Sequence, residues 1–291
     1  MSSYLNNQSC SKCKLCMDVC PCNVIGISEN DELYFIPERE SICQRCGQCM
    51  AVCKTKSIKV DGFGYDSDFT DLPRNNVDYN AFIDFLANRR SIRNFKDKAV
   101  PKEIIEKVLE ALSFAPYGAE PEKIQITVVN DRKQIESALP YIENFLDNIV
   151  NWIEHPIASR MMKRRNIPEK FNTVKNHLYP IAKLGNYKLE EGDRITRNAP
   201  AIIILHARKD AEEHTNNSMI YATYMMLAAH SLGLGATLIG LVPPSINKVR
   251  EVKEIFRVPD ENEAVMSLIL GYPNIKYRRT IVRKRQAEWL S

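Results

Sequence analysis

A spacing of cysteines that occurs twice near the start of the chain constrains this sequence more than any other feature. Eight of the nine cysteines in the 291 residues stand in two copies of the pattern C-x2-C-x2-C-x3-C. The copies are Cys10, Cys13, Cys16 and Cys20, and Cys43, Cys46, Cys49 and Cys53. In such runs the fourth cysteine ligates the cluster of the other run. The sequence therefore predicts two 4Fe–4S clusters, with ligands Cys10, Cys13, Cys16 and Cys53 for one and Cys43, Cys46, Cys49 and Cys20 for the other.

The repeat extends beyond the ligands. Ile25 and Ile58 each lie five residues after a fourth cysteine, and we expect both to pack beside the clusters. Pro21 follows the first run, whereas Lys54 takes its place after the second. With these features, residues 3–61 resemble the bacterial two-cluster ferredoxin fold.

Two other uses of cysteine fit less well. A disulfide framework needs an oxidising compartment, and no secretory signal precedes Cys10, so we expect a cytoplasmic protein. Structural zinc sites use cysteine pairs separated by a longer gap, not triplets. The ninth cysteine, Cys22, is expected to be a small buried side chain and not a ligand.

Composition limits the class of protein. The chain is 44% apolar and 26% charged with a net charge of +4, as in ordinary soluble globular proteins. A nucleic-acid-binding protein would carry a stronger basic excess, and no apolar run reaches transmembrane length. The length predicts a second domain after the cysteines. We expect a cluster domain at 1–61, a linker rich in Asp, Gly and Asn at 62–78, and a larger domain at 79–291.

Hydrophobic periodicity predicts an α+β fold for the larger domain, with helices around one sheet. Helices are expected from residue 79, from Pro101 to about Phe114, and at 219–231 and 246–256. Strands are expected at 124–129, 201–207, 236–242 and 264–270. Residues 132–190 are predicted to be mostly helical, with breaks at Pro140, Pro156, Pro168 and Pro180. No G-x-G-x-x-G follows a strand, so a Rossmann dinucleotide site is not indicated.

Four local motifs follow one another in this domain. They are Arg89-Arg90-Ser91-Ile92-Arg93-Asn94-Phe95, Ala115-Pro116-Tyr117-Gly118, the segment from Leu227 to Gly235, and Gly271-Tyr272-Pro273 with Arg283-Lys284-Arg285 beyond it. Each motif is weak alone, but their order is similar to that of the FMN-dependent nitroreductase family over residues 79–291. With the cysteine runs, the whole chain resembles the ferredoxin–nitroreductase fusions of anaerobic bacteria and archaea.

The resemblance implies an FMN site. Arg89, Ser91 and Arg93 would bind the phosphate and ribityl end with Arg90 in support, because guanidinium groups offer forked donors to phosphate. The resemblance also assigns FMN contacts to Pro116, Tyr117 and Gly118, to the backbone N–H groups of Leu238, Ile239 and Gly240, and to Arg283 and Arg285 at the phosphate. The sequence does not distinguish which of residues 283–285 point inward.

One position departs from the family pattern. Glu120 stands where the family usually has an asparagine at the flavin edge. A carboxylate there would disfavour an anionic reduced flavin, so either Glu120 points away or the flavin is tuned differently. Glu120, His155 and His177 are the candidate proton-transfer residues, whereas His206 and His230 lie in apolar segments and are expected to be buried.

The resemblance implies an iron–sulfur flavoprotein oxidoreductase. FMN would convert single electrons from the clusters into a two-electron reduction of a small conjugated acceptor, such as a nitroaromatic, quinone or enone. Reduced ferredoxin or NAD(P)H would be the donor, and a homodimer is expected. Two alternatives stay open: a module that passes electrons to a protein partner, and a non-catalytic redox sensor with an altered FMN site. Dehalogenation and flavin fragmentation also occur on this fold.

Overall fold

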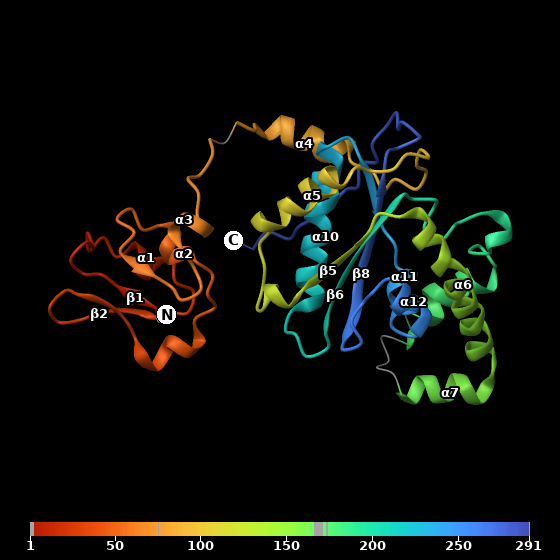
Figure 1. Cartoon of the computed structure of the whole chain (residues 1–291), viewed down its shortest axis with the longest axis horizontal. Coiled ribbons are helices and arrows are strands. Elements are labelled where there is room, and N and C mark those ends of the chain that lie inside the picture. The colour runs from red at the N-terminus through yellow and green to blue at the C-terminus, as the bar shows by residue number, and fades with distance from the viewer. Residues whose placement is uncertain (1–2, 75, 166–170, 173, 291) are drawn as a thin grey trace. The chain divides into compact units, whose positions relative to one another are not determined.

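The chain divides into two compact units, Met1–Val77 and Asp78–Ser291. A computed structural model describes residues 3–74, 76–165, 171–172 and 174–290. Each unit has its own hydrophobic core. Figure 1 shows the first unit in red and orange and the second from yellow to blue.

The first unit is built from two short antiparallel ribbons and short helices. Strand β1 (Tyr4–Leu5) pairs with β4 (Ile58–Lys59), and β2 (Ile25–Ile27) pairs with β3 (Leu33–Phe35). The helices are α1 (Leu15–Asp18), α2 (Gln48–Ala51), α3 (Tyr65–Asp68) and the 3-10 helix Pro37–Ile42. As predicted, Ile25 and Ile58 are buried in the core that the cysteines surround. Cys22 is only half-buried, so the expectation that it fills the core was wrong.

Part of the expected linker belongs to the first unit. Phe63, Tyr65 and Phe69 pack against the cysteine-lined core, and the Tyr65 hydroxyl donates to the Ile58 carbonyl at 2.8 Å. The Phe69 ring lies between those of Phe63 and Tyr65, with centroids 5.9 and 5.5 Å away. The segment was predicted to be a linker because it is rich in Asp and Gly. Its three aromatic side chains nevertheless pack it against the first unit.

The second unit has one four-stranded antiparallel sheet. Its spatial order is β5 (Gln125–Val129), β6 (Ala201–Arg208), β8 (Asn262–Gly271) and β7 (Gly235–Leu238). The two central strands β6 and β8 carry long apolar runs because helices cover both faces of the sheet. Strand β7 lies at one edge, where its outer backbone groups are not paired by another strand of this sheet.

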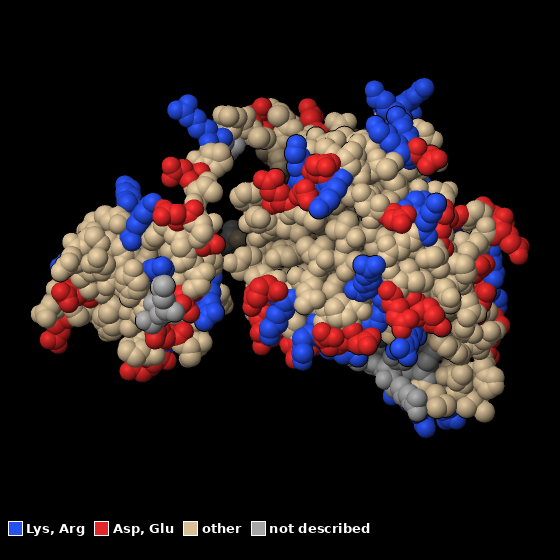
Figure 2. Space-filling model, viewed as in Figure 1, with Lys and Arg blue, Asp and Glu red and all other residues tan. Residues whose placement is uncertain are grey.

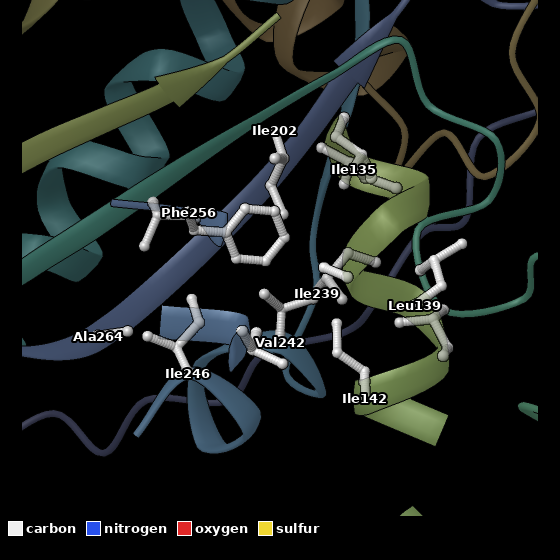
Figure 3. Close-up of a cluster of buried hydrophobic side chains, with 14 of the residues drawn as sticks. Ile135, Leu139, Ile142, Ile202, Ile239, Val242, Ile246, Phe256 and Ala264 are labelled. Atoms are coloured by element: carbon white, nitrogen blue, oxygen red, sulfur yellow. The ribbon is translucent and has the colours of Figure 1, made fainter. Parts of the chain in front are cut away.

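The helices lie in two layers. One layer comprises α5 (Lys102–Glu110) and α10 (His214–Ser231), and the other comprises α6 (Arg132–Glu154), α11 (Val242–Ile246) and α12 (Arg250–Ile255) (Figure 1). Figure 3 shows the second layer, with α6 residues such as Ile135 and Ile142 facing Ile202 of the sheet. The remaining elements are α4 (Tyr79–Asn88), α7 (Pro156–Arg165), α9 (Tyr179–Lys183), a π-turn at Val174–Leu178, and 3-10 turns at Ala111–Phe114, Pro121–Lys123 and Leu189–Glu191.

Four boundaries differ from the expectations, for physical reasons. Pro140 does not break α6, because it sits on the exposed side of a helix whose opposite face is deeply buried. The expected strand 236–242 ends at Leu238, because Pro243 and Pro244 favour the first turn of a helix, which becomes α11. The expected helix 246–256 starts later, as α12 at Arg250, since α11 ends at Ile246 and the Asn247 side chain pairs with the backbone of Ala264. Helix α10 begins earlier than expected, at His214.

The α+β prediction is confirmed. The break expected at Pro156 occurs where α7 begins, whereas helical backbone continues through Pro180, from the π-turn at Val174–Leu178 into α9. Pro168 lies outside the described residues. Within the described ranges, the helices are all too short or too polar to span a membrane. Basic and acidic side chains are interspersed over the visible face of the second unit (Figure 2).

Candidate cofactor sites

The cysteines of the first unit gather into two groups, which cross the two runs. Cys16 lies close enough to Cys10 and Cys53 for their thiolate charges to interact, and Cys13 interacts in the same way with Cys53. Cys49 is influenced in the same way by Cys46, Cys20 and Cys43. A small cavity is lined by Cys20, Cys43, Cys46 and Cys49. We call Cys10, Cys13, Cys16 and Cys53 the first thiol group, and Cys20, Cys43, Cys46 and Cys49 the second.

The spacing inside these groups suits a cluster and not a lone ion. Across the described residues, no three His, Cys, Asp or Glu side chains converge closely enough to hold one metal ion. Sulfurs around a single zinc lie only about 2.3 Å from it, whereas a cubane holds its thiolates farther apart. Burial, followed by the nearby Cys46, raises the pKa of the Cys49 thiol to about 12. Coordination to iron would offset the free-energy cost of ionising this buried thiol, because a coordinated thiol is deprotonated.

In the second unit, the segment that contains Ser91 runs along the free edge of β7. Ser91 forms a parallel bridge with Ala236, and the Ile92 N–H donates to the Ala236 carbonyl at 3.2 Å. Farther along, the Lys96 N–H donates to the Tyr272 carbonyl at 2.8 Å. Gly235 permits this approach, since a Cβ there would lie 2.4 Å from Ile92 Cγ1. The first and last motifs of the sequence therefore meet at β7.

The direction of the peptide groups at the end of β7 separates the three residues expected to contact the flavin ring. The Ile239 N–H donates to the Ser267 carbonyl at 3.0 Å, and its own carbonyl accepts from Ser267 Oγ at 2.7 Å. Its side chain points into the core (Figure 3). Backbone groups alternate between the two edges of a strand. The Leu238 N–H therefore faces the outer edge, on the side of the segment that contains Ser91, while the backbone groups of Ile239 are used by the sheet. Gly240 follows in a bend after the strand has ended.

Three arginines gather where that segment leaves α4. Burial lowers the pKa of Arg89, and the charges of Arg90 and Arg283 lower it further. Arg90 Nη2 donates to the Ala87 carbonyl at 2.8 Å and to the Thr280 hydroxyl, which holds the C-terminal segment against α4. Like charges brought together and desolvated form a site for an anion. The exposed Arg285 instead donates from Nη1 to the Lys284 carbonyl at 3.5 Å.

A second positive site was missed by sequence analysis. Burial lowers the pKa of Arg197, and Arg93 lowers it further, so these two guanidinium groups lie near each other. The nearby carboxylate of Asp193 is already engaged, because it accepts from Arg132 Nη2 at 3.0 Å and from the Thr196 N–H at 2.7 Å. Arg197 also has a left-handed backbone, with φ of 60°. A lone arginine before a strand carries no motif, so only the fold identifies it.

The loop with Pro116, Tyr117 and Gly118 is exposed, and α10 anchors it. Asn217, fully buried, accepts from the Gly118 N–H at 2.7 Å and donates to the Ala119 carbonyl at 2.9 Å. Glu120 is turned into this anchor, because its carboxylate accepts from the Glu212 N–H at 3.0 Å and binds Lys123. The Glu120 carboxylate is therefore already paired within this loop, and its role toward a flavin stays a prediction.

The histidines divide by location. His155 is exposed and caps α7, its Nδ1 accepting from the Ala158 N–H at 3.4 Å, and His177 is exposed on the π-turn. His206 is buried as expected. His230 is only half-buried, contrary to expectation, with its ring 4.9 Å from that of Phe85. It lines an open groove of about 490 Å³ together with Arg89, Arg90, Lys96, Tyr272 and Tyr277.

Comparison with known proteins assigns both units. Residues 86–272 match the model of the nitroreductase family, and residues 9–64 match that of a 4Fe-4S dicluster domain. A Methanothermobacter thermautotrophicus protein, provisionally named as an NADH dehydrogenase/NAD(P)H nitroreductase, is 24% identical over 66% of this chain and 76% of its own length. An iodotyrosine deiodinase of Thermotoga neapolitana is 22% identical over 66% of this chain and 88% of its own.

Solved structures agree on the fold. A Bacteroides fragilis nitroreductase with bound FMN superposes with a TM-score of 0.53 and 18% identity, covering 72% of this chain and 98% of that one. The resemblance noted in the sequence is thus confirmed. The chain belongs to the nitroreductase family and carries an N-terminal 4Fe-4S dicluster domain.

Proposed function

We propose that this protein is an iron–sulfur flavoprotein that passes electrons between two 4Fe–4S clusters and FMN and reduces a small conjugated acceptor. The observation that carries the proposal is the gathering of Arg90 and Arg283 around the partly buried Arg89 at the edge of β7. In the same chain, the first and second thiol groups would each supply four ligands to one cluster. FMN exchanges one or two electrons, so it supplies the step from single electrons to a two-electron reduction.

The residues at the edge of β7 fit each end of FMN. Arg89 and Arg283 would hold the dianionic phosphate, with Arg90 fixing the C-terminal segment beside them. The outward N–H of Leu238, with the N–H of Gly240 in the bend that follows, would meet the polar edge of the ring. Arg93 and Arg197 would place positive charge where a reduced flavin carries negative charge. Ser91 lies between Arg89 and Arg93 in sequence and is proposed for the ribityl chain.

We also propose that the protein works as a homodimer. The C-terminal segment after Pro273 forms no helix or strand within the described residues, yet it carries large apolar side chains. Val282, Trp289 and Leu290 are 84, 90 and 91% exposed, and Tyr79 on α4 is 75% exposed. Exposed apolar surface of this kind marks an interface. Light scattering on the purified protein should give twice the chain mass.

The first test is composition. Protein purified without oxygen should hold about eight irons and eight sulfides per chain, and one FMN. Eight irons with no flavin that can be restored would leave the cluster half standing and reject the flavin mechanism.

The second test distinguishes donors and acceptors. Flavin bleaching is followed without oxygen, first with NAD(P)H and then with reduced ferredoxin, before a nitroaromatic, a quinone, an enone or an iodotyrosine is added. Reoxidation by one of these classes identifies the acceptor. If none reoxidises the flavin, the protein passes its electrons to another protein.

A further inference from the structure

The two cysteine runs allow an internal comparison, because each residue of the first has a counterpart in the second. We compare four exposed positions in the loops of the first thiol group, each within three residues of one of its cysteines. All four are lysines, and all four are exposed: Lys12, Lys14, Lys54 and Lys56. Their counterparts beside the second thiol group are Arg45, Gly47, Pro21 and Asn23. At these four positions the first end therefore carries four cationic side chains and the second carries one, while Arg39 of the second end donates from Nη1 to the Asn23 carbonyl at 3.1 Å.

Backbone conformation shows that this difference is not imposed by the fold. Lys14 has φ of 63° and its counterpart Gly47 has φ of 72°, so both loops make the same left-handed turn. Glycine adopts that conformation with least strain. The turn at position 14 would therefore be less strained with glycine, and it does not require the positive charge that lysine adds.

Access to the two ends differs as well. Cys13 of the first thiol group is exposed, whereas its counterpart Cys46 is half-buried. Gly47 is buried beneath the aromatic segment, and a Cβ there would lie 3.3 Å from the Phe69 ring and 3.9 Å from the Phe63 ring. A protein partner can therefore approach the first thiol group more closely than the second.

The lysines keep most of their charge available. In the described part of the unit, the carboxylate within ion-pair distance of them is Asp31, 3.8 Å from Lys12 Nζ and 3.6 Å from Lys14 Nζ. Both contacts are long and exposed, and such pairs are weak and readily exchanged. Lys56 Nζ stands over the Tyr65 ring at 5.6 Å, which holds it beside the unit without neutralising it.

We propose that Lys12, Lys14, Lys54 and Lys56 form the docking surface for an acidic one-electron carrier protein, and we call these residues the lysine rim. This inference rests on the proposed function, since it needs a cluster in the first thiol group. Encounters between electron-transfer proteins are small and transient, and complementary charge supplies much of their rate and orientation. The rim would orient the carrier toward the exposed Cys13.

Binding tests this directly, with an acidic bacterial two-cluster ferredoxin as the probe. The test variant is Lys14→Gly/Lys54→Gln/Lys56→Asn, in which residues 14 and 56 take the identities of their counterparts Gly47 and Asn23 and residue 54 becomes neutral. Glycine and asparagine also tolerate the left-handed backbone at positions 14 and 56. Its Kd for the oxidised probe at low salt should rise about tenfold, as expected for three lost charge contacts. The slope of log Kd against log salt should also fall.

Arg45→Gln is the matched control, because it removes the cation at the position equivalent to Lys12. Its Kd should change less than twofold. Equal weakening by both variants, or no weakening by the triple variant, overturns the proposal. Iron and sulfide content is measured on every variant, and a variant that loses iron is replaced by Lys14→Gly alone, with the same expected direction. Because binding is measured without turnover, a protein that lacked flavin would refute the proposed function while leaving the docking result readable.

Discussion

At the scale of single residues, the flavin proposal depends on two arginines from opposite ends of the second unit. Arg89 closes α4 and Arg283 lies in the C-terminal segment, yet each contributes to the same positive site, in which Arg89 is partly buried. Sequence analysis selected both from family motifs, and the fold brings them together.

Arg89→Ala and Arg283→Ala should each weaken FMN binding on the order of tenfold or more. Charge-assisted hydrogen bonds to a phosphate contribute about 1.5–3 kcal/mol. Flavin fluorescence titration of the apoprotein measures the change. Arg250→Ala, an exposed arginine paired with Glu254 at 2.7 Å, is the control and should bind FMN normally. Full flavin retention by both site variants would refute the assignment.

His206 links stability to pH. Burial lowers its pKa, and Lys253 lowers it further. The unfolded chain binds this proton near pH 6.5, whereas the folded chain resists it. Stability should therefore be unaffected by His206 above pH 7 and should fall as pH drops through about 6.5 toward the lower folded pKa. Urea unfolding at pH 7.5 and pH 5.5 measures this, and His206→Gln should show a smaller difference. An unchanged difference would exclude His206 as the cause.

At the scale of elements, β7 and the segment that contains Ser91 act as one structure. Gly235→Ala should lower stability by about 1–3 kcal/mol and weaken FMN binding, because its Cβ would push Ile92 away from the strand. The double variant Gly235→Ala/Ile92→Gly should recover flavin binding, since it removes all three Ile92 atoms, Cβ included, that the new Cβ would meet. Thermal unfolding and flavin titration report both effects. Failure of the double variant to bind better than Gly235→Ala would show that contact with Ile92 is not the reason.

The elements also show what sequence can and cannot predict. The strands β6 and β8 could be predicted from sequence, because burial on both faces of the sheet gives each a nearly continuous apolar run. The start of α10 was missed since its first turns include Asn217 and Ser218, polar residues that the fold buries completely. The cysteine spacing predicted a local arrangement fixed by cluster geometry. Arg197 and the anchoring role of Asn217 depend on contacts between distant segments, which no local pattern encodes.

At the scale of the whole molecule, the two units have separate cores. The first is organised around the cysteines, and its apolar core is small, as in domains that need metal to fold. Removal of iron by a chelator should therefore abolish the unfolding transition of the first unit and leave that of the second within about 2 °C. Differential scanning calorimetry before and after chelation measures both. A single transition lost as a whole would show that the units unfold together.

The free edge of β7 has a consequence for chains that lack their cofactor. Ser91 and Ile92 cover this edge at Ala236, and the outward N–H of Leu238 continues it beyond the covered part, like the edge of an open sheet. Such an edge can recruit a strand from another molecule. A bound flavin would occupy it, and so would act as a cap that keeps one sheet from joining the next. Loss of flavin would then favour aggregation, and the cell's supply of flavin would set how much of this protein stays in solution.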